Sequence, residues 1–179
     1  MNRFYKVSRA QFIYDMKRCF SAVDYDYLFS FESANTMYEE IKLPERKTAH
    51  SAGYDFFLPL DIELLPYPTT LQPKGTLVVP TGIKCELDEG FFLQMHIRSS
   101  IGIKHGVILS NATGIIDADY FNNPANEGHI MFALRNLSPS KFSADAGSAI
   151  AQGIISRYYT ADDDTADGKR VGGIGSTGI

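Results

Sequence analysis

Residues 91–98 read FFLQMHIR, and their alternation of apolar and polar side chains decides the fold class. Alternation with a period of two is the pattern of a half-buried β-strand, and residues 129–136, HIMFALRN, repeat it. The apolar positions expected to face the core are Leu93, Met95 and Ile97 in the first stretch and Ile130, Phe132 and Leu134 in the second. From Ser51 onward such runs are separated by turn residues, with no helical period between them. The sequence therefore predicts an all-β domain, a distorted antiparallel jelly roll or β-barrel.

The two ends of the chain differ from this β-rich part. The first 46 residues hold ten aromatic residues and no Gly. Ser8 and Gln11 have the spacing of a capping box, which predicts a short helix from about Ala10 to Phe20, followed by a strand or loop. The last residues are polar and then Gly-rich, which predicts a flexible C-terminal arm. The expected organisation is an N-terminal helical extension that packs against something over residues 1–46, a jelly-roll domain over 47–160 and a mobile arm over 161–179.

Composition excludes several classes of protein. The chain has 179 residues and a net charge of -4, with 17 basic residues dispersed among 21 acidic ones, which leaves no basic face for nonspecific nucleic-acid binding. No apolar run reaches the roughly 18 residues of a membrane helix, and the N-terminus has no signal-peptide core. Cys19 and Cys85 fit no metal-ligand or redox pattern, so both are expected to be packed free thiols. We expect a cytoplasmic protein without nucleic-acid or membrane partners.

Five short segments carry residues suited to chemistry, and each alone is common. In chain order they are SAGYDF at 51–56, RSS at 98–100, NATGIIDADY at 111–120, AQG at 151–153 and RVGGIGSTG at 170–178. In this order and spacing they resemble the five motifs of the trimeric dUTPase family. The resemblance implies a jelly-roll homotrimer with three active sites, each built from all three subunits, which uses Mg²⁺ to split dUTP into dUMP and pyrophosphate.

Hydrolysis at the α-phosphorus needs an in-line water, a group that accepts its proton, and positive charge to offset the triphosphate. The resemblance implies that Asp117 is the aspartate that positions this water and accepts its proton. A carboxylate is ionised at neutral pH but is a weak base, so it needs the help of a divalent cation. The Mg²⁺ is expected to be held mainly through substrate phosphates and waters, with Asp55 supporting that region through waters or an Arg contact. Asp119, just past the turn, is expected to brace the hairpin or a buried Arg.

The resemblance implies which of the other site residues contact the base, the sugar and the phosphates. Tyr120 would lie against the deoxyribose, where its ring denies space and a partner to a 2′-hydroxyl. Asn111 and the backbone up to Gly114 would read uracil through main-chain groups, whose donor and acceptor pattern cytosine reverses. Arg and Ser side chains suit phosphate oxygens, and glycines allow close backbone approach. The residues expected to contact phosphates or to close over the nucleotide are Arg98, Ser99, Ser100, Gln152, Arg170, Gly173, Ile174, Gly175, Ser176 and Thr177.

The chain departs from the family pattern at several places. Ile174 stands where many members have a Phe that stacks on uracil, and Ala149 stands where an Arg often precedes the fourth motif. Residues 121–128, FNNPANEG, make the connection after Tyr120 longer than the tight turn of many members. These differences put the closure over the base and some phosphate contacts in doubt, but not the reaction.

Two alternatives belong to neighbouring functions. A dCTP deaminase or bifunctional relative would need a glutamate on the strand after the hairpin, where this chain has Ala133, and a zinc deaminase would need H-x-E with P-C-x-x-C, which is absent. The other alternative is a regulatory protein on the dUTPase fold, as phage-borne members can be, which binds a protein partner through the N-terminal extension or the 121–128 insertion. Retention of the five motifs favours an active dUTP diphosphatase.

Overall fold

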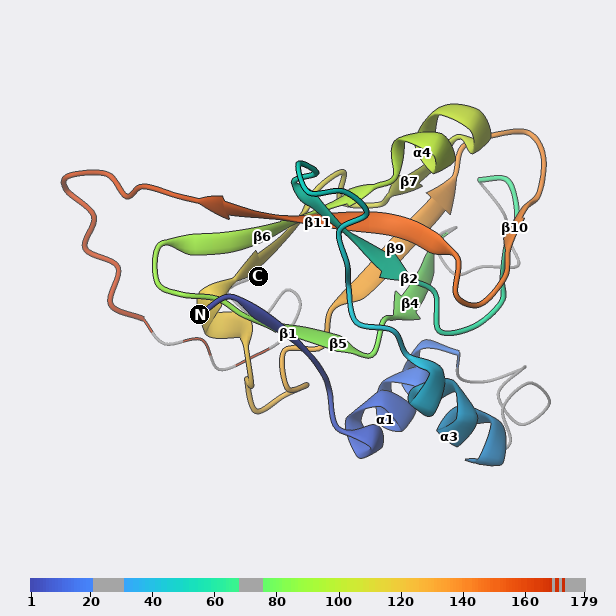
Figure 1. The fold of residues 1–179 in the computed structure, drawn as a ribbon, viewed down its shortest axis with the longest axis horizontal. Coiled ribbons are helices and arrows are strands. Elements are labelled where there is room, and N and C mark those ends of the chain that lie inside the picture. The colour runs from blue at the N-terminus through green and yellow to red at the C-terminus, as the bar shows by residue number, and fades with distance from the viewer. Residues whose placement is uncertain (21–30, 68–75, 169, 171, 173–179) are drawn as a thin grey trace.

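The computed structural model describes residues 1–20, 31–67, 76–168, 170 and 172 (Figure 1). Every pairing between its strands is antiparallel. The strands are β1 (Arg3–Lys6), β2 (Gly53–Phe57), β3 (Ile62–Leu64), β4 (Leu77–Pro80), β5 (Ile83–Glu86), β6 (Phe91–Ile97), β7 (Val107–Leu109), β8 (Gly114–Asp117), β9 (Met131–Asn136), β10 (Phe142–Ala144) and β11 (Ala149–Arg157). They form a four-stranded sheet in the order β2-β11-β6-β8, a three-stranded sheet β4-β9-β7, and the pairs β1-β5 and β10-β3. The predicted all-β, jelly-roll-like class is confirmed, although no sheet of the described residues closes into a barrel.

The core lies where the predicted strand alternation places it. Leu93 and Met95 of β6 are buried, and so are Phe132 and Leu134 of β9, whereas Ile97 is half-buried. The rings of Phe56 from β2 and Phe132 meet edge to face with their centroids 5.8 Å apart, which joins the two larger sheets. The prediction of two half-buried strands is therefore confirmed.

The helices correct part of the sequence prediction. Those of the described residues are α1 (Arg9–Cys19), α3 (Phe31–Glu40), α4 (Ser99–His105) and the 3₁₀ turn η2 (Ala118–Tyr120). The first helix is confirmed, but the strand or loop expected after it is wrong for residues 31–40; residues 21–30 lie outside the described part. The expectation of no helix beyond Ser51 is wrong at α4, a short helix that ends at Gly106 in the left-handed conformation. Tertiary contacts favour the helix at α3, where Ala34, Met37 and Tyr38 recur at helical spacing on its buried side.

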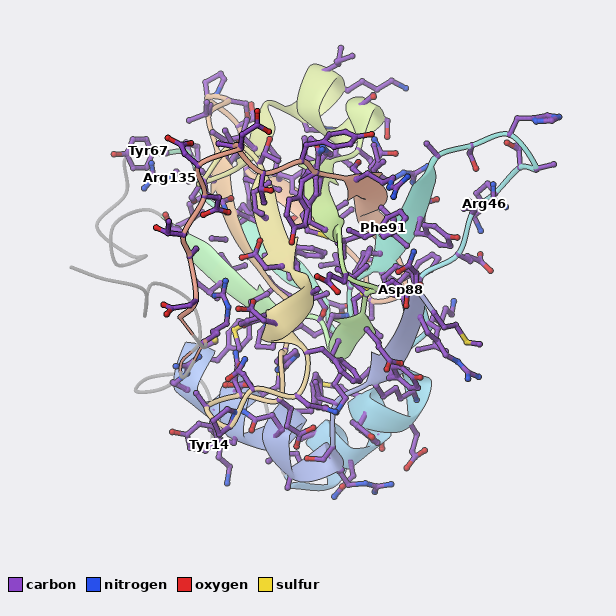
Figure 2. All side chains as sticks on the ribbon, turned by 90° about the vertical axis from the view of Figure 1, so that its left-hand side faces the viewer. Tyr14, Arg46, Tyr67, Asp88, Phe91 and Arg135 are labelled. Carbon is purple, nitrogen blue, oxygen red and sulfur yellow. The ribbon has the colours of Figure 1, made fainter. Side chains whose placement is uncertain are left out.

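The N-terminal residues pack into the same core as the strands. β1 pairs with β5, with Phe4 opposite Cys85, and the α1 side chains Phe12 and Met16 are fully buried. Figures 1 and 2 show α1 and α3 together at one end of the molecule and α4 at the other; Tyr14 lies on the outer side of α1 (Figure 2) and is exposed. The boundary at residue 46 stays a prediction.

Both cysteines are free. Burial raises the pKa of the Cys85 thiol to about 12 and that of Cys19 to about 11, so both remain protonated packing residues at neutral pH. Among the described residues, no helix has the length and apolar character needed to cross a membrane.

Candidate functional site

One cavity of about 180 Å³ lies beside β8 and η2, and we call it the Tyr120 cavity. The side chains and backbone that form it come from β6, β8, β9, the connections around them and the C-terminal arm. The lining residues are Met95, Leu109, Asn111, Gly114, Ile115, Ile116, Asp117, Tyr120, His129, Ile130, Met131, Phe132, Ala133 and Arg170. The residues predicted to read the base, meet the sugar and hold the water, namely Asn111, Gly114, Tyr120 and Asp117, are thus brought together.

Asp117 ends β8 and meets the C-terminal arm. Arg170 donates from Nη2 to Asp117 Oδ2 at 2.5 Å and from Nε to Asp119 Oδ1 at 2.8 Å. Its guanidinium carbon also lies 5.8 Å from the centroid of the Tyr120 ring. The side chain of Arg170 is only 17% exposed, so Asp119 braces a largely buried Arg, as the sequence led us to expect. The arm therefore reaches back to the wall of the Tyr120 cavity on the same chain.

Tyr120 is held at its hydroxyl by two hydrogen bonds. It is buried, its hydroxyl donates to the main-chain oxygen of His129 at 3.0 Å, and it accepts from Asn126 Nδ2 at 2.7 Å. Burial raises the pKa of the phenol, so it stays a neutral donor. The ring is consequently a fixed wall of the cavity.

The turn from Ser110 to Thr113 carries the main-chain groups expected to read the base. Ala112 adopts a left-handed backbone, and the amide of Thr113 donates to the oxygen of Asn111 at 2.6 Å. Gly114 follows at the start of β8, where a Cβ would lie 3.1 Å from Cβ of Met95. The absence of a side chain at Gly114 keeps this wall of the cavity open.

A second hollow, of about 320 Å³, collects the predicted phosphate-contacting residues, and we call it the Arg98 groove. It lies where β2, the start of α4 and β11 meet. The lining residues are Lys47, Ser51, Gly53, Asp55, Arg98, Ser99, Ser100 and Gln152. The second and fourth motifs are therefore assembled with the first, as their resemblance predicts.

Asp55 contacts an Arg, which is one of the two kinds of support expected for it, and that residue is Arg98. Arg98 Nε lies 3.2 Å from Asp55 Oδ1, and its Nη1 donates to the main-chain oxygen of Ala149 at 3.3 Å. The second carboxylate oxygen, Oδ2, is buried and has no hydrogen-bond partner among the described residues. Because an unpaired buried carboxylate oxygen is costly, this atom is a natural acceptor for a group brought by a ligand.

Sequence reasoning missed three contributions to the groove. Gly53 makes room for Gln152, since a Cβ there would lie 2.5 Å from Gln152 Oε1. Arg46, on the connection that leads into β2 (Figure 2), donates to the main-chain oxygens of Ala49 and Ser51 at 3.0 Å each and holds that turn. Lys47 adds a second cation to the lining. The signal for Gly53 was present in the SAG motif, but nothing in the sequence singled out Arg46 or Lys47.

The two hollows share no lining residue. The Tyr120 cavity offers an apolar wall, a phenol, a carboxylate and the guanidinium of Arg170, while the Arg98 groove offers two cations, three serine hydroxyls, a carboxylate and an amide. Gly173, Ile174, Gly175, Ser176 and Thr177 lie outside the described residues, so their predicted roles stay predictions.

A model of the dUTPase family matches residues 39–178. The chain belongs to the dUTPase family. It is 39% identical over 140 residues to a deoxyuridine 5′-triphosphate nucleotidohydrolase of Lactococcus lactis, covering 77% of this chain and 89% of that one. It is 38% identical over 143 residues to the Wolinella succinogenes enzyme of the same name, covering 76% and 86%.

Solved structures of the family share the fold. The crystal structure of dUTPase from Streptococcus mutans superposes with a TM-score of 0.59 at 37% identity, covering 67% of this chain and 88% of that one. The dUTPase from phage phi11 of Staphylococcus aureus gives 0.57 at 20% identity, covering 73% and 92%, a likeness of fold alone. The family match begins at residue 39, so α1 and nearly all of α3 precede it.

Proposed function

We propose that this member of the dUTPase family hydrolyses dUTP to dUMP and pyrophosphate. The observation that carries the proposal is the Tyr120 cavity, in which the Asn111–Gly114 turn, the phenol of Tyr120 and the carboxylate of Asp117 line one space. A base, a deoxyribose and an α-phosphate have this same order along a nucleotide. The activity would remove dUTP, which limits uracil in DNA, and would supply dUMP.

Each residue has a distinct part in the proposed reaction. Asp117 orients a water toward the α-phosphorus and accepts its proton, while Arg98, Ser99, Ser100 and Gln152 bind phosphate oxygens. Arg170 balances the charge of Asp117 in the structure. Triphosphate would draw this guanidinium away, which leaves Asp117 free to face the water and brings the arm over the nucleotide with Gly173, Ile174, Gly175, Ser176 and Thr177.

The Arg98 groove fits a magnesium ion bound together with the triphosphate. No group of three or more His, Cys, Asp or Glu side chains suited to a metal occurs within the described part of the chain. The unpartnered Oδ2 of Asp55 is an acceptor for a metal-bound water, so the ion would be held through phosphates and waters with Asp55 behind them. When bound, Mg²⁺ neutralises phosphate charge and polarises the scissile centre.

We further propose that the working enzyme is a homotrimer. The support is the division of the site, since the base and sugar elements line one hollow and the phosphate elements another with no residue in common. Packing copies so that the Arg98 groove of one subunit meets the Tyr120 cavity of another would assemble a complete site. Equilibrium sedimentation of the purified protein tests the state directly.

The experiment that tests the reaction is a substrate panel with Mg²⁺. Pyrophosphate and ammonia are assayed with dUTP, dCTP, dTTP and UTP. We expect rapid release of pyrophosphate from dUTP alone, with only a slow residual reaction on UTP, and no ammonia from dCTP. Ala133 occupies the cavity wall where deamination would need a proton carrier, and Asp117 is the one carboxylate among the described lining residues. Equal turnover of dUTP and dTTP, or release of ammonia from dCTP, would contradict the proposal.

A further inference from the structure

The insertion 121–128 folds inward onto Tyr120. Asn123 and Asn126 are buried although their side chains are polar. Asn123 Nδ2 donates to the main-chain oxygen of Tyr120 at 3.1 Å and to Asn126 Oδ1 at 2.8 Å, while Asn126 Nδ2 donates to the Tyr120 hydroxyl at 2.7 Å. Every one of these bonds ends on Tyr120 or on the asparagine that holds it. The insertion is thus a clamp around one ring.

Gly128 allows the clamp to close. Its φ is +78°, and a Cβ there would lie 2.4 Å from the main-chain oxygen of Tyr120. Asn126 Oδ1 accepts from the amide of Gly128 at 3.1 Å, which fixes the return of the chain into β9. Any residue larger than glycine would push the insertion off Tyr120.

His129 extends the clamp to the N-terminal helix. Its main-chain oxygen accepts the Tyr120 hydroxyl, and its fully buried ring is bonded at both nitrogens. The amide of Gly82 donates to Nε2 at 2.7 Å, so that nitrogen carries a lone pair and Nδ1 carries the proton that it donates to Asp15 Oδ2 at 2.7 Å. Asp15 is itself fully buried on α1 and accepts from Gln11 Nε2 at 2.7 Å.

A second link ties the insertion to the start of α1. Ser8 caps the helix by accepting from the amide of Gln11, and both its amide and its hydroxyl donate to Glu127, at 2.9 and 2.6 Å. Glu127 thereby takes the place of the capping-box side chain that the sequence assigned to Gln11. The N-terminal helix and the insertion are therefore one hydrogen-bonded unit.

We infer that Asp15, His129 and Asn126 are positioning residues that set the discrimination between deoxyribose and ribose by fixing the Tyr120 ring. The inference rests on the proposed function, in which that ring meets the sugar. A ring bonded at its hydroxyl by two partners, one of them anchored through an imidazole to a buried carboxylate, cannot turn aside to admit a 2′-hydroxyl. The N-terminal helix and the 121–128 insertion thus share one role, which is to hold the Tyr120 ring in place.

The test compares sugar discrimination in matched variants. The measured quantity is the ratio of kcat/KM for dUTP to kcat/KM for UTP. A purely structural defect lowers both values of kcat/KM by the same factor and so leaves this ratio unchanged. We expect Asp15→Ala and Asn126→Ser each to lower this ratio about five- to tenfold, the effect of losing one hydrogen bond. Asp15→Asn keeps an oxygen acceptor for His129 Nδ1–H and is expected to recover most of the ratio. Circular dichroism establishes which variants fold, and Asn126→Ser carries the test if Asp15→Ala does not.

The control is Glu127→Gln, a change in the same insertion that touches Ser8 and Lys84 but not the Tyr120 ring. Its ratio should equal that of the wild type. A ratio constant within twofold in the folded Asp15 and Asn126 variants overturns the inference, and so does an equal fall in the control. If the wild type itself releases no pyrophosphate from dUTP, the proposed function fails and the inference falls with it.

Discussion

Replacement of Asp117 by Asn separates catalysis from binding and from stability. The amide keeps the shape of the side chain but cannot accept a proton from water. General-base catalysis contributes roughly a hundredfold to ten-thousandfold, or about 3–5 kcal/mol of transition-state stabilisation, so we expect kcat to fall by that range. Affinity for an α,β-imido analogue of dUTP should remain within a few fold of the wild type.

The stability of this variant follows from the contacts of Asp117. Its side chain is 48% exposed, so the pair with Arg170 is screened by solvent, and Arg170 keeps its bond to Asp119. Exposed ion pairs contribute about 0.2–1 kcal/mol, and the free energy of unfolding should therefore change by less than about 1 kcal/mol. Urea unfolding measures this, steady-state pyrophosphate release measures turnover, and titration calorimetry measures binding.

Asp119→Asn is the matched control, because Asp119 binds the same guanidinium without lining the Tyr120 cavity. We expect its turnover to stay within a few fold of the wild type. An Asp117→Asn enzyme that keeps a tenth or more of its turnover would show that the water is positioned elsewhere. Equal losses in the two variants would show that both act through release of Arg170.

Three further outcomes are expected. Gly53→Ala places a Cβ 2.5 Å from Gln152 Oε1, so the flexible amide must leave the Arg98 groove. We expect kcat/KM for dUTP to fall at least about tenfold, while the free energy of unfolding in urea changes little. Unchanged kinetics would show that Gln152 is dispensable. A chain ended after Gly168 should retain its circular dichroism spectrum and its oligomeric state but turn over dUTP poorly, since Arg170 and the predicted closing residues are lost; an unfolded product would make the arm structural. Burial raises the pKa of Asp15, but the bonds from His129 and Gln11 outweigh this and leave the pKa lowered from 3.8. The carboxylate therefore stabilises the fold above its unfolded pKa, and that stability is lost as the pH falls through the folded pKa. Between about pH 5 and about pH 3, the free energy of unfolding measured in urea should fall more steeply for the wild type than for Asp15→Asn.

The strands were predictable because burial of one sheet face imposes a period of two on the sequence. Leu93 and Met95 show that pattern without competition from other signals. α4 was not predictable, since Ile101 and Ile103 look like strand residues and its seven residues are too few for a helical period. α3 follows a segment of mixed character, and its helical state depends on packing that local propensity does not contain.

The candidate site was predictable where its residues are close in sequence or fall in a recognisable motif. Asn111, Gly114, Asp117 and Tyr120 lie within ten positions, and the structure brings them to one cavity. The bond between Asp15 and His129 joins residues 114 positions apart, and neither stands in a motif. A lone His beside an apolar run is most often a core residue. The sequence therefore did not indicate that His129 has a role at the site.

The chemistry of the clamp itself argues that it serves position rather than stability. Burying two asparagines, a histidine and a carboxylate costs free energy that their mutual hydrogen bonds only offset, and apolar side chains of the same volume would stabilise the region at least as well. Apolar packing, however, permits a ring to slide or rotate by small amounts, whereas a hydroxyl held between Asn126 Nδ2 and the oxygen of His129 has one orientation. A polar network retained at such a cost beside a substrate cavity is expected where the location of one group must be exact to a fraction of an ångström, and the Tyr120 hydroxyl is the group that this network fixes through Asn126 and His129.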